Sequence, residues 1–350
     1  MRKKTLTLLI TLLLAIVAVV GCGGSDQSAD KTNEKPQTGG TEAPATVKTK
    51  ELKLAFNQPE NHPQYKAMEQ LSKKFAEQTN NEYEIKIFPN ELLGSQRETI
   101  ELVQSGTIAM SIVAGSLMEN FNQDYAVFNL PYVYDSREHQ MSVLNDQEIV
   151  GDLFRSTESQ GMFVLGTFHS GTRNVYTKKP VLSPADLKGL KIRVMESDTN
   201  IKMMAAMGGT GTPMGQGEVY TAIQSGVLDG GENNELIYSN LKHVEVAPHF
   251  TYTQHLMIPD YLITNSDVFN MMSAEHQALF MQLFQEAVDY AIELWVVDVE
   301  TAKAAAEAAG GIFHTVDIKV FQDEVLPLHD EKVVGDTAKA LYEKVRQAAK

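Results

Sequence analysis

The chain has 350 residues, of which 43% are hydrophobic, and 45 Asp and Glu against 30 Lys and Arg give it a formal net charge of −15. A chain this acidic is a poor partner for nucleic acid or anionic lipid, because like charges repel. The charge does not exclude a small anionic ligand, since a buried arginine acts locally. The length and hydrophobic content suffice for one large domain or for two of ordinary size.

Residues 1–21 have the composition of an export signal. The three cations of residues 2–4 precede an apolar run at residues 6–20. This run of about 15 residues is shorter than the roughly 20 that a membrane-spanning helix needs. We therefore predict a signal peptide that is absent from the mature protein.

The only cysteine of the chain, Cys22, follows the small residues Val19, Val20 and Gly21. This order resembles the bacterial lipobox, in which the cysteine is acylated and becomes the mature N-terminus. A single cysteine also excludes a disulfide within the chain. We predict an extracytoplasmic protein that a lipid on Cys22 anchors to the cell membrane, on its periplasmic side or its outer face. The alternative is a free thiol beside an ordinary signal peptide.

Residues 22–50 are predicted to form a flexible tether. The stretch 23–50 contains almost no side chain that is able to bury apolar surface, so it should not form a packed structure. A flexible chain of about 28 residues spans on the order of 30 Å.

From residue 51 on, strand and helix patterns alternate. Residues 51–56 alternate apolar and polar side chains, whereas residues 63–79 carry apolar side chains at helical spacing. Ser95, with Glu98 three residues later, is a capping box that begins a helix. The patterns predict strands at 51–56, 83–88 and 107–113 and helices at 63–79 and 95–104.

The middle of the chain repeats this organisation. Residues 98–109 and 218–229 share a glutamate, then Gln-Ser-Gly, then an apolar strand start in the same register. Each is a helix that ends at a glycine and turns into a strand, which favours two similar α/β domains over one large sheet. Further strands are predicted at 127–132, at 163–168 and within 244–265, and a helix is predicted at 137–156.

The segment 189–234 carries the predicted binding residues. It contains a short strand that ends near Arg193, a helix that Ser197 or Asp198 begins, and a Gly-rich stretch that leads to Asn233. Loops at the strand ends of such βαβ units gather at one crevice and present polar groups to a ligand.

A long helix is predicted near the C-terminus, at 274–309. Residues 274–309 include no Gly or Pro, and Gly310 follows directly. A helix of about 36 residues is roughly 54 Å long, longer than one domain of this size, so it should lie against both domains.

Six motifs resemble the solute receptors of tripartite ATP-independent periplasmic (TRAP) transporters of the DctP type. The similarity runs from about residue 51 to about residue 345, with order and spacing kept. The motifs are LGSQRE (93–98), NLPYVY (129–134), GTR (171–173), SPADLKGLKIRV (183–194), TPM (212–214) and GEVYTAIQSGVLDGGENN (217–234).

The resemblance implies an α/β, two-lobed, periplasmic-binding-protein-like fold with a hinge and a long helix that spans both lobes. The lobes implied are 51–170 plus 260–298 and 171–259 plus 299–350. Such a receptor binds a carboxylated organic solute between its lobes. It delivers the solute to the small and large membrane subunits of a permease that an ion gradient drives.

The resemblance also implies the binding residues. Arg193 holds the substrate carboxylate, Arg173 is a second contact to the anion, and Asn233 supplies an amide. A planar guanidinium suits a carboxylate because two parallel N–H donors meet two oxygens. The full predicted set is Arg193, Arg173, Asn233, Asn234, Gln216, Met214, His62, His255 and Met195.

The solute is expected to be a sugar acid. Residues 61–63, 176–180, 232–234 and 254–260 look like a subgroup associated with hexuronates such as glucuronate or galacturonate. Where receptors for sialic acid and ectoine have an aromatic residue, this chain has residues 215–217, Gly-Gln-Gly, so an amide replaces ring stacking. A C4-dicarboxylate or another hydroxy acid remains open. His62 and His255, taken alone, fit a core or surface role as well.

Catalysis finds little support in the sequence. There is no Gly-x-Ser-x-Gly motif, and His243, His249 and His255 are six residues apart instead of at zinc-ligand spacing. The glycines of residues 208–211 follow a helix, which does not fit a dinucleotide site. We expect no enzyme activity, no cofactor and no metal. The other functions left open are a ligand-sensing input to a membrane sensor kinase and, less in keeping with the motifs, a secreted enzyme.

Overall fold

The computed structural model describes residues 49–349. The predicted signal peptide, the lipidation site Cys22 and most of the tether lie outside these residues. Within the described residues, no helix is both long enough and apolar enough to cross a membrane.

The first sheet has five strands in the order β2-β1-β3-β10-β4. β1 runs parallel to β2 and β3, whereas β10 is antiparallel to both of its neighbours. β10 comes from far along the chain, after five of the six strands of the second sheet, so the first sheet is not built from one contiguous segment. The strands are β1 (Lys50–Phe56), β2 (Tyr83–Phe88), β3 (Met110–Ala114), β4 (Met162–Phe168) and β10 (Asp260–Asn265).

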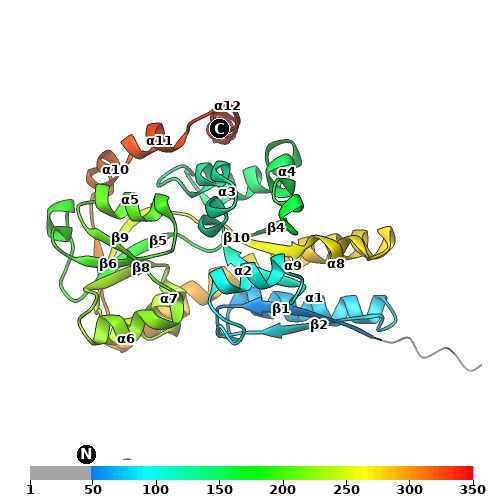
Figure 1. The fold of residues 1–350 in the computed structure, drawn as a ribbon. Coiled ribbons are helices and arrows are strands. Elements are labelled where there is room, and N and C mark those ends of the chain that lie inside the picture. Colours follow the sequence, from blue (N-terminus) through cyan, green and yellow to red (C-terminus); the bar gives the residue numbers. More distant parts are fainter. Residues whose placement is uncertain (1–48, 350) are drawn as a thin grey trace, which may run out of the picture. The chain divides into compact units, whose positions relative to one another are not determined.

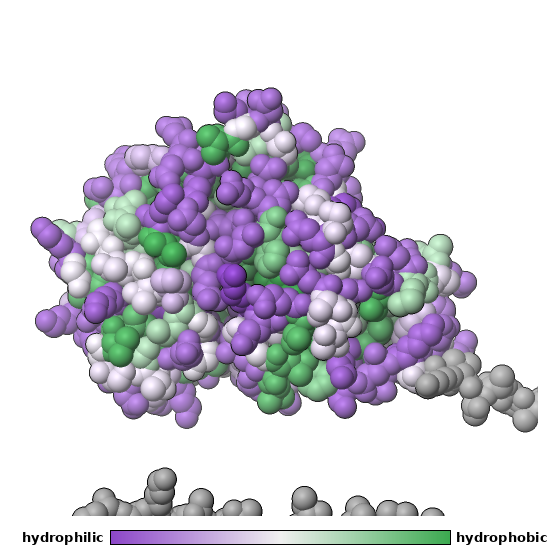
Figure 2. Space-filling view, in the orientation of Figure 1, coloured by the Kyte–Doolittle hydropathy of each residue, from purple (hydrophilic) through white to green (hydrophobic). Residues whose placement is uncertain are grey.

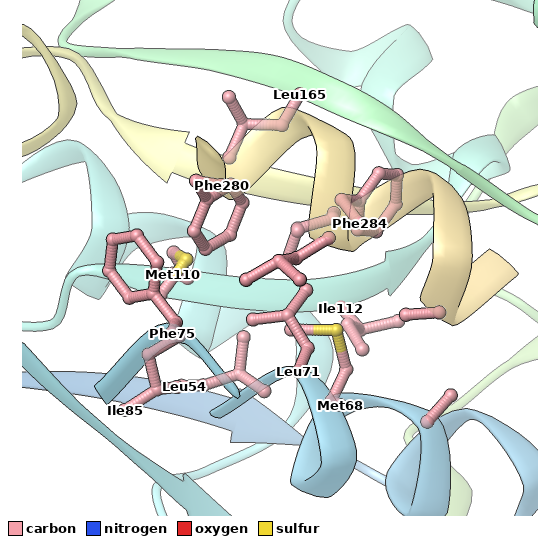
Figure 3. Close-up of a cluster of buried hydrophobic side chains, with 14 of the residues drawn as sticks. Leu54, Met68, Leu71, Phe75, Ile85, Met110, Ile112, Leu165, Phe280 and Phe284 are labelled. Atoms are coloured by element: carbon pink, nitrogen blue, oxygen red, sulfur yellow. The ribbon is translucent and has the colours of Figure 1, made fainter. Parts of the chain in front are cut away.

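Helices cover both faces of the first sheet because its strands alternate their apolar side chains between the two. Leu54 of β1 faces the cluster that contains the helices α1 and α9, whereas its neighbour Ala55 faces the opposite cluster. Figure 3 shows Phe75 of α1 next to Phe280 of α9 on the side of Leu54, with Phe284 farther along α9 and Leu71 between Phe284 and Leu54. The helices associated with this sheet are α1 (Pro63–Gln78), α2 (Gln96–Gln104), α3 (Arg137–Leu144), α4 (Gln147–Arg155) and α8 (Ser266–Asn270).

The second sheet has six strands in the order β11-β9-β5-β8-β6-β7. β6 is parallel to β7 and β8, and β5 is antiparallel to β8 and β9. The parallel β6 and β8 end side by side, which brings Arg193 and the residues after Gly231 together. The strands are β5 (Arg173–Thr177), β6 (Lys191–Val194), β7 (Thr210–Pro213), β8 (Gly230–Asn233), β9 (His249–Leu256) and β11 (Ile312–Thr315).

Local sequence signals define the helices of the second lobe. Ser197 caps α5 by accepting from the N–H of Asn200, as predicted, and Gly208 ends the segment with φ +101°, which a residue with a Cβ rarely adopts. Figure 1 shows α5 on one side of the second sheet and α6 and α7 on the other. The helices are α5 (Asp198–Ala206), α6 (Val219–Gln224), α7 (Glu235–Asn240) and α10 (Lys319–Val325), with α11 (Pro327–Lys332) following.

The long helix α9 (Ala274–Ala308) confirms the predicted span to within one residue. Its first half packs on α1 beside the first sheet, and its second half packs on α7 beside the second sheet. Trp295, in the middle of α9, shares a small cluster with Leu236 of α7. The α/β fold with two sheets and a long helix against both is therefore confirmed.

Two predicted elements are wrong in detail. The apolar run at 127–132, predicted as a strand, belongs to a 3-10 helix, η2 (Gln123–Asn129), that Asn122 caps. A short buried apolar run does not distinguish strand from helix by periodicity. The predicted helix at 137–156 is divided into α3 and α4, because Asp146 caps a new helix by accepting from the N–H of Glu148.

The lobe boundaries stay a prediction, and the C-terminal helix α12 (Asp336–Gln347) bears on them. Its buried residues Ala338, Leu341 and Val345 pack in the same cluster as α2 and α4 of the first lobe. We propose the predicted division with this one change, that α12 goes with the first lobe.

The face of the molecule in Figure 2 is largely hydrophilic, and its apolar residues form small, separate groups. This distribution agrees with the acidic composition. Large apolar side chains gather instead inside the four main clusters of the two lobes.

Removing a side chain from the core of the first lobe tests this description. Phe280→Ala, at a fully buried position, should lower the free energy of unfolding by about 3–5 kcal/mol, because it leaves a cavity. The neighbouring Met281→Ala, at a position that is 37% exposed, is the matched control and should change it by about 0.5 kcal/mol or less. Urea unfolding measures both, and equal losses would contradict the packing.

Candidate functional site

Arg193 lies on β6, and its side chain is buried, with 3% exposed. Its Nε and Nη2 both donate to the carbonyl oxygen of Met214, at 2.9 and 2.7 Å. Nη1 is 3.5 Å from Oε1 of Gln216. The Met214 carbonyl thus fixes one edge of the guanidinium and leaves Nη1 as its least satisfied donor.

No carboxylate among the described residues forms an ion pair with Arg193. Burial lowers the pKa of Arg193, although the charge of Glu232 partly opposes this. A buried charge is costly unless a partner of opposite charge compensates it. Arg193 therefore has the capacity to receive an anion.

Arg173, at the start of β5, is in the opposite situation. Its Nε and Nη2 donate to the two carboxylate oxygens of Glu232 at 2.5 and 2.8 Å, a bidentate pair. Burial is the largest single effect and lowers the pKa of Arg173, but the charge and the hydrogen bonds of Glu232, with smaller contributions from Tyr176 and Asp260, together raise it. Burial would likewise raise the pKa of Glu232, but Arg173, helped by His255, lowers it to about 2. The charge of Arg173 is compensated within the fold.

Asn233 connects the two arginines. Its Oδ1 accepts from Nη1 of Arg173 at 3.1 Å and from the N–H of Asn234 at 2.9 Å. Because both contacts require an oxygen acceptor, the amide is oriented with Nδ2 on the other side, 3.5 Å from Oε1 of Gln216. One oxygen of Gln216 is thus faced by Nη1 of Arg193 and Nδ2 of Asn233, both at the long distance of 3.5 Å.

A narrow cavity with a volume of about 10 Å³, room for about one water molecule, lies beside these donors. Its lining comes from both lobes: the segment between β2 and α2 and the residue Leu117 from the first, and the end of β6 and the turn after β7 from the second. The lining residues are Glu91, Ser95, Gln96, Leu117, Arg193, Met195, Glu196, Met214, Gly215 and Gln216.

The structure brings together six of the nine predicted binding residues. Arg193, Gln216, Met214 and Met195 line the cavity. Asn233 does not line the cavity but lies with its Nδ2 3.5 Å from Oε1 of Gln216, and Arg173 donates to Oδ1 of Asn233.

The other three predicted residues make contacts elsewhere in the fold. His62 caps α1, since its Nδ1 accepts from the N–H of Gln64 at 3.3 Å, and burial lowers its pKa to about 3. Asn234 caps α7 by accepting from the N–H of Ile237 at 3.0 Å. His255 is fully buried, with Nδ1 2.8 Å from Oγ1 of Thr253 and Nε2 3.4 Å from Glu232.

Five further residues line the cavity and were not predicted from the sequence: Glu91, Ser95, Gln96, Leu117 and Glu196. Ser95 and Gln96 lie within the LGSQRE motif, so the motif was a usable signal for them. Glu91 gave no such signal, because its place in the cavity depends on a turn conformation that the sequence does not reveal. Among the described residues, no group of three or more His, Cys, Asp or Glu is arranged to hold a metal ion.

Two α/β lobes that share a small, arginine-bearing cavity define a solute receptor of the periplasmic-binding-protein class. The DctP family model, described as bacterial extracellular solute-binding protein, family 7, matches residues 54–335, and the chain belongs to this family.

Solved structures support the same assignment. A TRAP periplasmic solute binding protein from Anaerococcus prevotii, with bound α/β-D-glucuronate, is 37% identical, with a TM-score of 0.84 over 86% of this chain and 98% of that one. One from Xanthobacter autotrophicus, with bound β-D-galacturonate, is 32% identical, with a TM-score of 0.82 over 85% and 99%. The 2,3-diketo-L-gulonate-binding periplasmic protein of Escherichia coli is 28% identical over 80% of this chain and 85% of that protein.

Members of the DctP family are receptors that bind small carboxylated solutes outside the cytoplasm and work with the membrane subunits of a TRAP permease. This agrees with the predicted fold, class and localisation outside the cytoplasm.

The Arg173–Glu232 pair can be tested by its effect on stability. Glu232→Gln should lower the free energy of unfolding at neutral pH by about 3–5 kcal/mol, because it leaves a buried guanidinium without its countercharge. The native pKa of Glu232, about 2, is below its ordinary value of 4.5. Its contribution is therefore fully present above pH 4.5 and is lost as the pH falls towards 2.

Urea unfolding of the wild type and the variant, at pH 7 and at pH 3, measures both effects. The difference between the two proteins should shrink at pH 3. Asp323→Asn removes the exposed partner of Lys319 and should cost no more than about 1 kcal/mol. A Glu232→Gln effect no larger than this control would contradict the buried pair.

Proposed function

We propose that this chain is the lipid-anchored receptor of a TRAP transporter and that its solute is a hexuronate, D-glucuronate or D-galacturonate. It binds the solute without converting it and delivers it to the permease. The observation that carries the proposal is the buried guanidinium of Arg193 at a cavity lined by both lobes, which forms no ion pair within the part of the chain that the structure describes.

The carboxylate of the solute takes the place that Oε1 of Gln216 now holds. There it accepts from Nη1 of Arg193 and from Nδ2 of Asn233, the two donors that lie at a long 3.5 Å from the amide oxygen. A charged acceptor makes shorter and stronger hydrogen bonds than an amide does. The solute therefore gains more from these donors than Gln216 gives up.

Arg173 acts through Asn233 in this scheme. Its guanidinium, held by Glu232, donates to Oδ1 of Asn233 and so keeps Nδ2 of that amide towards the cavity. Arg173 is a positioning residue, and its positive charge adds to the attraction for an anion only to the extent that Glu232 leaves it uncompensated.

A bound solute favours closure because it touches both lobes. The donors for the carboxylate come from the second lobe, whereas Ser95 and Gln96 line the cavity from the first. A ligand shifts an equilibrium between open and closed forms only by its difference in affinity for the two. Contacts to both lobes exist only in the closed form, so they supply that difference.

The choice of a hexuronate rests on the relatives and on the polar lining. Two similar receptors were solved with glucuronate and galacturonate. Beside the arginine, the cavity offers neutral polar side chains, Ser95, Gln96 and Gln216, and Nε2 of Gln216 has no partner among the described residues. Such groups suit the hydroxyls of a sugar ring.

Binding tests the proposal directly. Titration calorimetry should give a dissociation constant in the nanomolar to micromolar range, about −8 to −12 kcal/mol, for D-glucuronate or D-galacturonate. At 100 times the dissociation constant, the solute should stabilise the protein by about 2.7 kcal/mol. Neutral D-glucose and D-galactose should neither bind nor stabilise the protein. Stabilisation by these sugars alone would contradict an anion site.

Arg193→Ala should weaken hexuronate binding at least about 30-fold, because truncating one partner of a buried charge pair costs roughly 2–5 kcal/mol. Arg97→Ala, at an exposed position of α2, is the matched control and should leave the affinity unchanged. The same calorimetric titration measures both. Equal affinities for the wild type and Arg193→Ala would remove Arg193 from the site.

The lipid anchor is tested in cells. The wild type should sediment with membranes and incorporate labelled fatty acid, whereas Cys22→Ser should do neither, because it lacks the thiol that is acylated. Unlabelled, soluble wild-type protein would argue for an unanchored receptor.

A further inference from the structure

Glu91 lies in an unusual turn between β2 and α2. Asn90 and Glu91 both have a positive φ, 56° and 55°. Asparagine tolerates this left-handed backbone conformation, but glutamate rarely adopts it. Two backbone hydrogen bonds to the end of β1 hold the turn, from the N–H of Asn90 to Gln58 at 3.1 Å and from the N–H of Glu91 to Phe56 at 3.2 Å. Such a conformation at a cavity wall indicates a functional constraint on the side chain.

The Glu91 side chain reaches the other lobe. Its Oε2 accepts from the N–H of Gly217 at 3.0 Å. Glycine permits this contact, because a Cβ at position 217 would lie only 2.6 Å from that oxygen. Its Oε1 is buried and has no hydrogen-bond partner within residues 49–349. A buried carboxylate oxygen without a partner, in the wall of a binding cavity, is an acceptor that awaits a donor.

The charges that line the cavity are asymmetric. Arg193 is the only cation among the lining residues, whereas two carboxylates, Glu91 and Glu196, also line it. Burial raises the pKa of Glu91, and the backbone N–H of Gly217, the Arg193 charge and the backbone N–H of Gln216 only partly oppose this. One end of the cavity therefore suits a carboxylate, and the rest suits groups that donate hydrogen bonds.

We propose that Glu91 is a specificity-determining residue, whose free carboxylate oxygen accepts a hydrogen bond from a hydroxyl of the solute and whose charge rejects acids that carry a second carboxylate. This assignment rests on the proposed function, since it requires a solute whose first carboxylate lies on Arg193. A hydroxyl donates to Glu91, whereas a second carboxylate meets like charge without a cation to compensate it. The site thus selects monocarboxylic sugar acids over aldaric and C4-dicarboxylic acids.

A matched pair of solutes tests the assignment. D-galacturonate and galactarate have the same configuration at C2 to C5, but galacturonate is a pyranose ring, whereas galactarate is an open chain with a second carboxylate at C1. D-galactonate, an open-chain acid with one carboxylate, is the control for shape and should bind more tightly than galactarate. Calorimetric titration of the wild type should give at least a 100-fold preference for galacturonate. D-glucuronate against D-glucarate repeats the comparison with another sugar.

The variant Glu91→Gln keeps the size and the turn but removes the charge, and its amide can donate to a carboxylate. In this variant the ratio of the galacturonate affinity to the galactarate affinity should fall at least tenfold, mainly because galactarate binds more tightly. Glu101→Gln, at an exposed position of α2 outside the cavity, is the control and should leave the preference unchanged. A melting curve of each variant without solute checks that it is folded.

The outcomes separate the two proposals. If the wild type binds neither uronate, the proposed function fails, and the role of Glu91 fails with it. If it binds a uronate but binds the matching aldarate within tenfold, or if Glu91→Gln leaves the preference unchanged, the role of Glu91 alone is overturned. Should Glu91→Gln not fold, Glu91→Ser takes its place in the same titrations, and a wild-type preference below tenfold overturns the role of Glu91 without any variant.

Discussion

The site depends on the different treatment of two neighbouring buried arginines. Arg173 has its own carboxylate, Glu232, in a bidentate pair, so its charge serves the architecture. Among residues 49–349, Arg193 donates only to a carbonyl and an amide oxygen, so its charge has no countercharge there. Because an uncompensated buried cation is costly, a bound anion relieves that cost. The relief contributes to the affinity and, through it, to the closed form.

The two arginines are joined by a short chain of polar contacts. Glu232 holds Arg173, Arg173 orients Asn233, and Asn233 and Arg193 face the same oxygen of Gln216. Each link fixes the direction of a donor, which matters because hydrogen bonds recognise geometry as well as charge. The rigid part of the site therefore belongs to the second lobe, and the first lobe adds Glu91, Ser95 and Gln96 across the cavity.

Much of the fold could be predicted because its signals are local. Capping boxes, glycines after helices and the long run without Gly or Pro gave the helices, and Ser95, Ser197 and Gly208 act as the sequence indicated. The run at 127–132 was mistaken for a strand, because a buried 3-10 helix and a buried strand share the same apolar composition.

The candidate site was less predictable, since the sequence shows the residue type but not its partner. Arg193 could be selected from its strand and motif. His62 looks like a ligand in the sequence, yet it caps a helix that begins with proline, a role that asparagine or serine more commonly fills. Glu91 could not be selected, because its position depends on two left-handed residues and on a contact with the other lobe, both of which are tertiary properties.

The long helix α9 has a consequence for how such receptors diversify. It supplies apolar side chains to the cores of both lobes, β10 completes the first sheet after five strands of the second, and β11 then completes the second sheet. Neither lobe is thus a contiguous module that one recombination event could exchange between relatives. A chimera with a single crossover would join mismatched halves in each core, so new solute preferences are more accessible through point substitutions in the cavity wall than through shuffling of lobes.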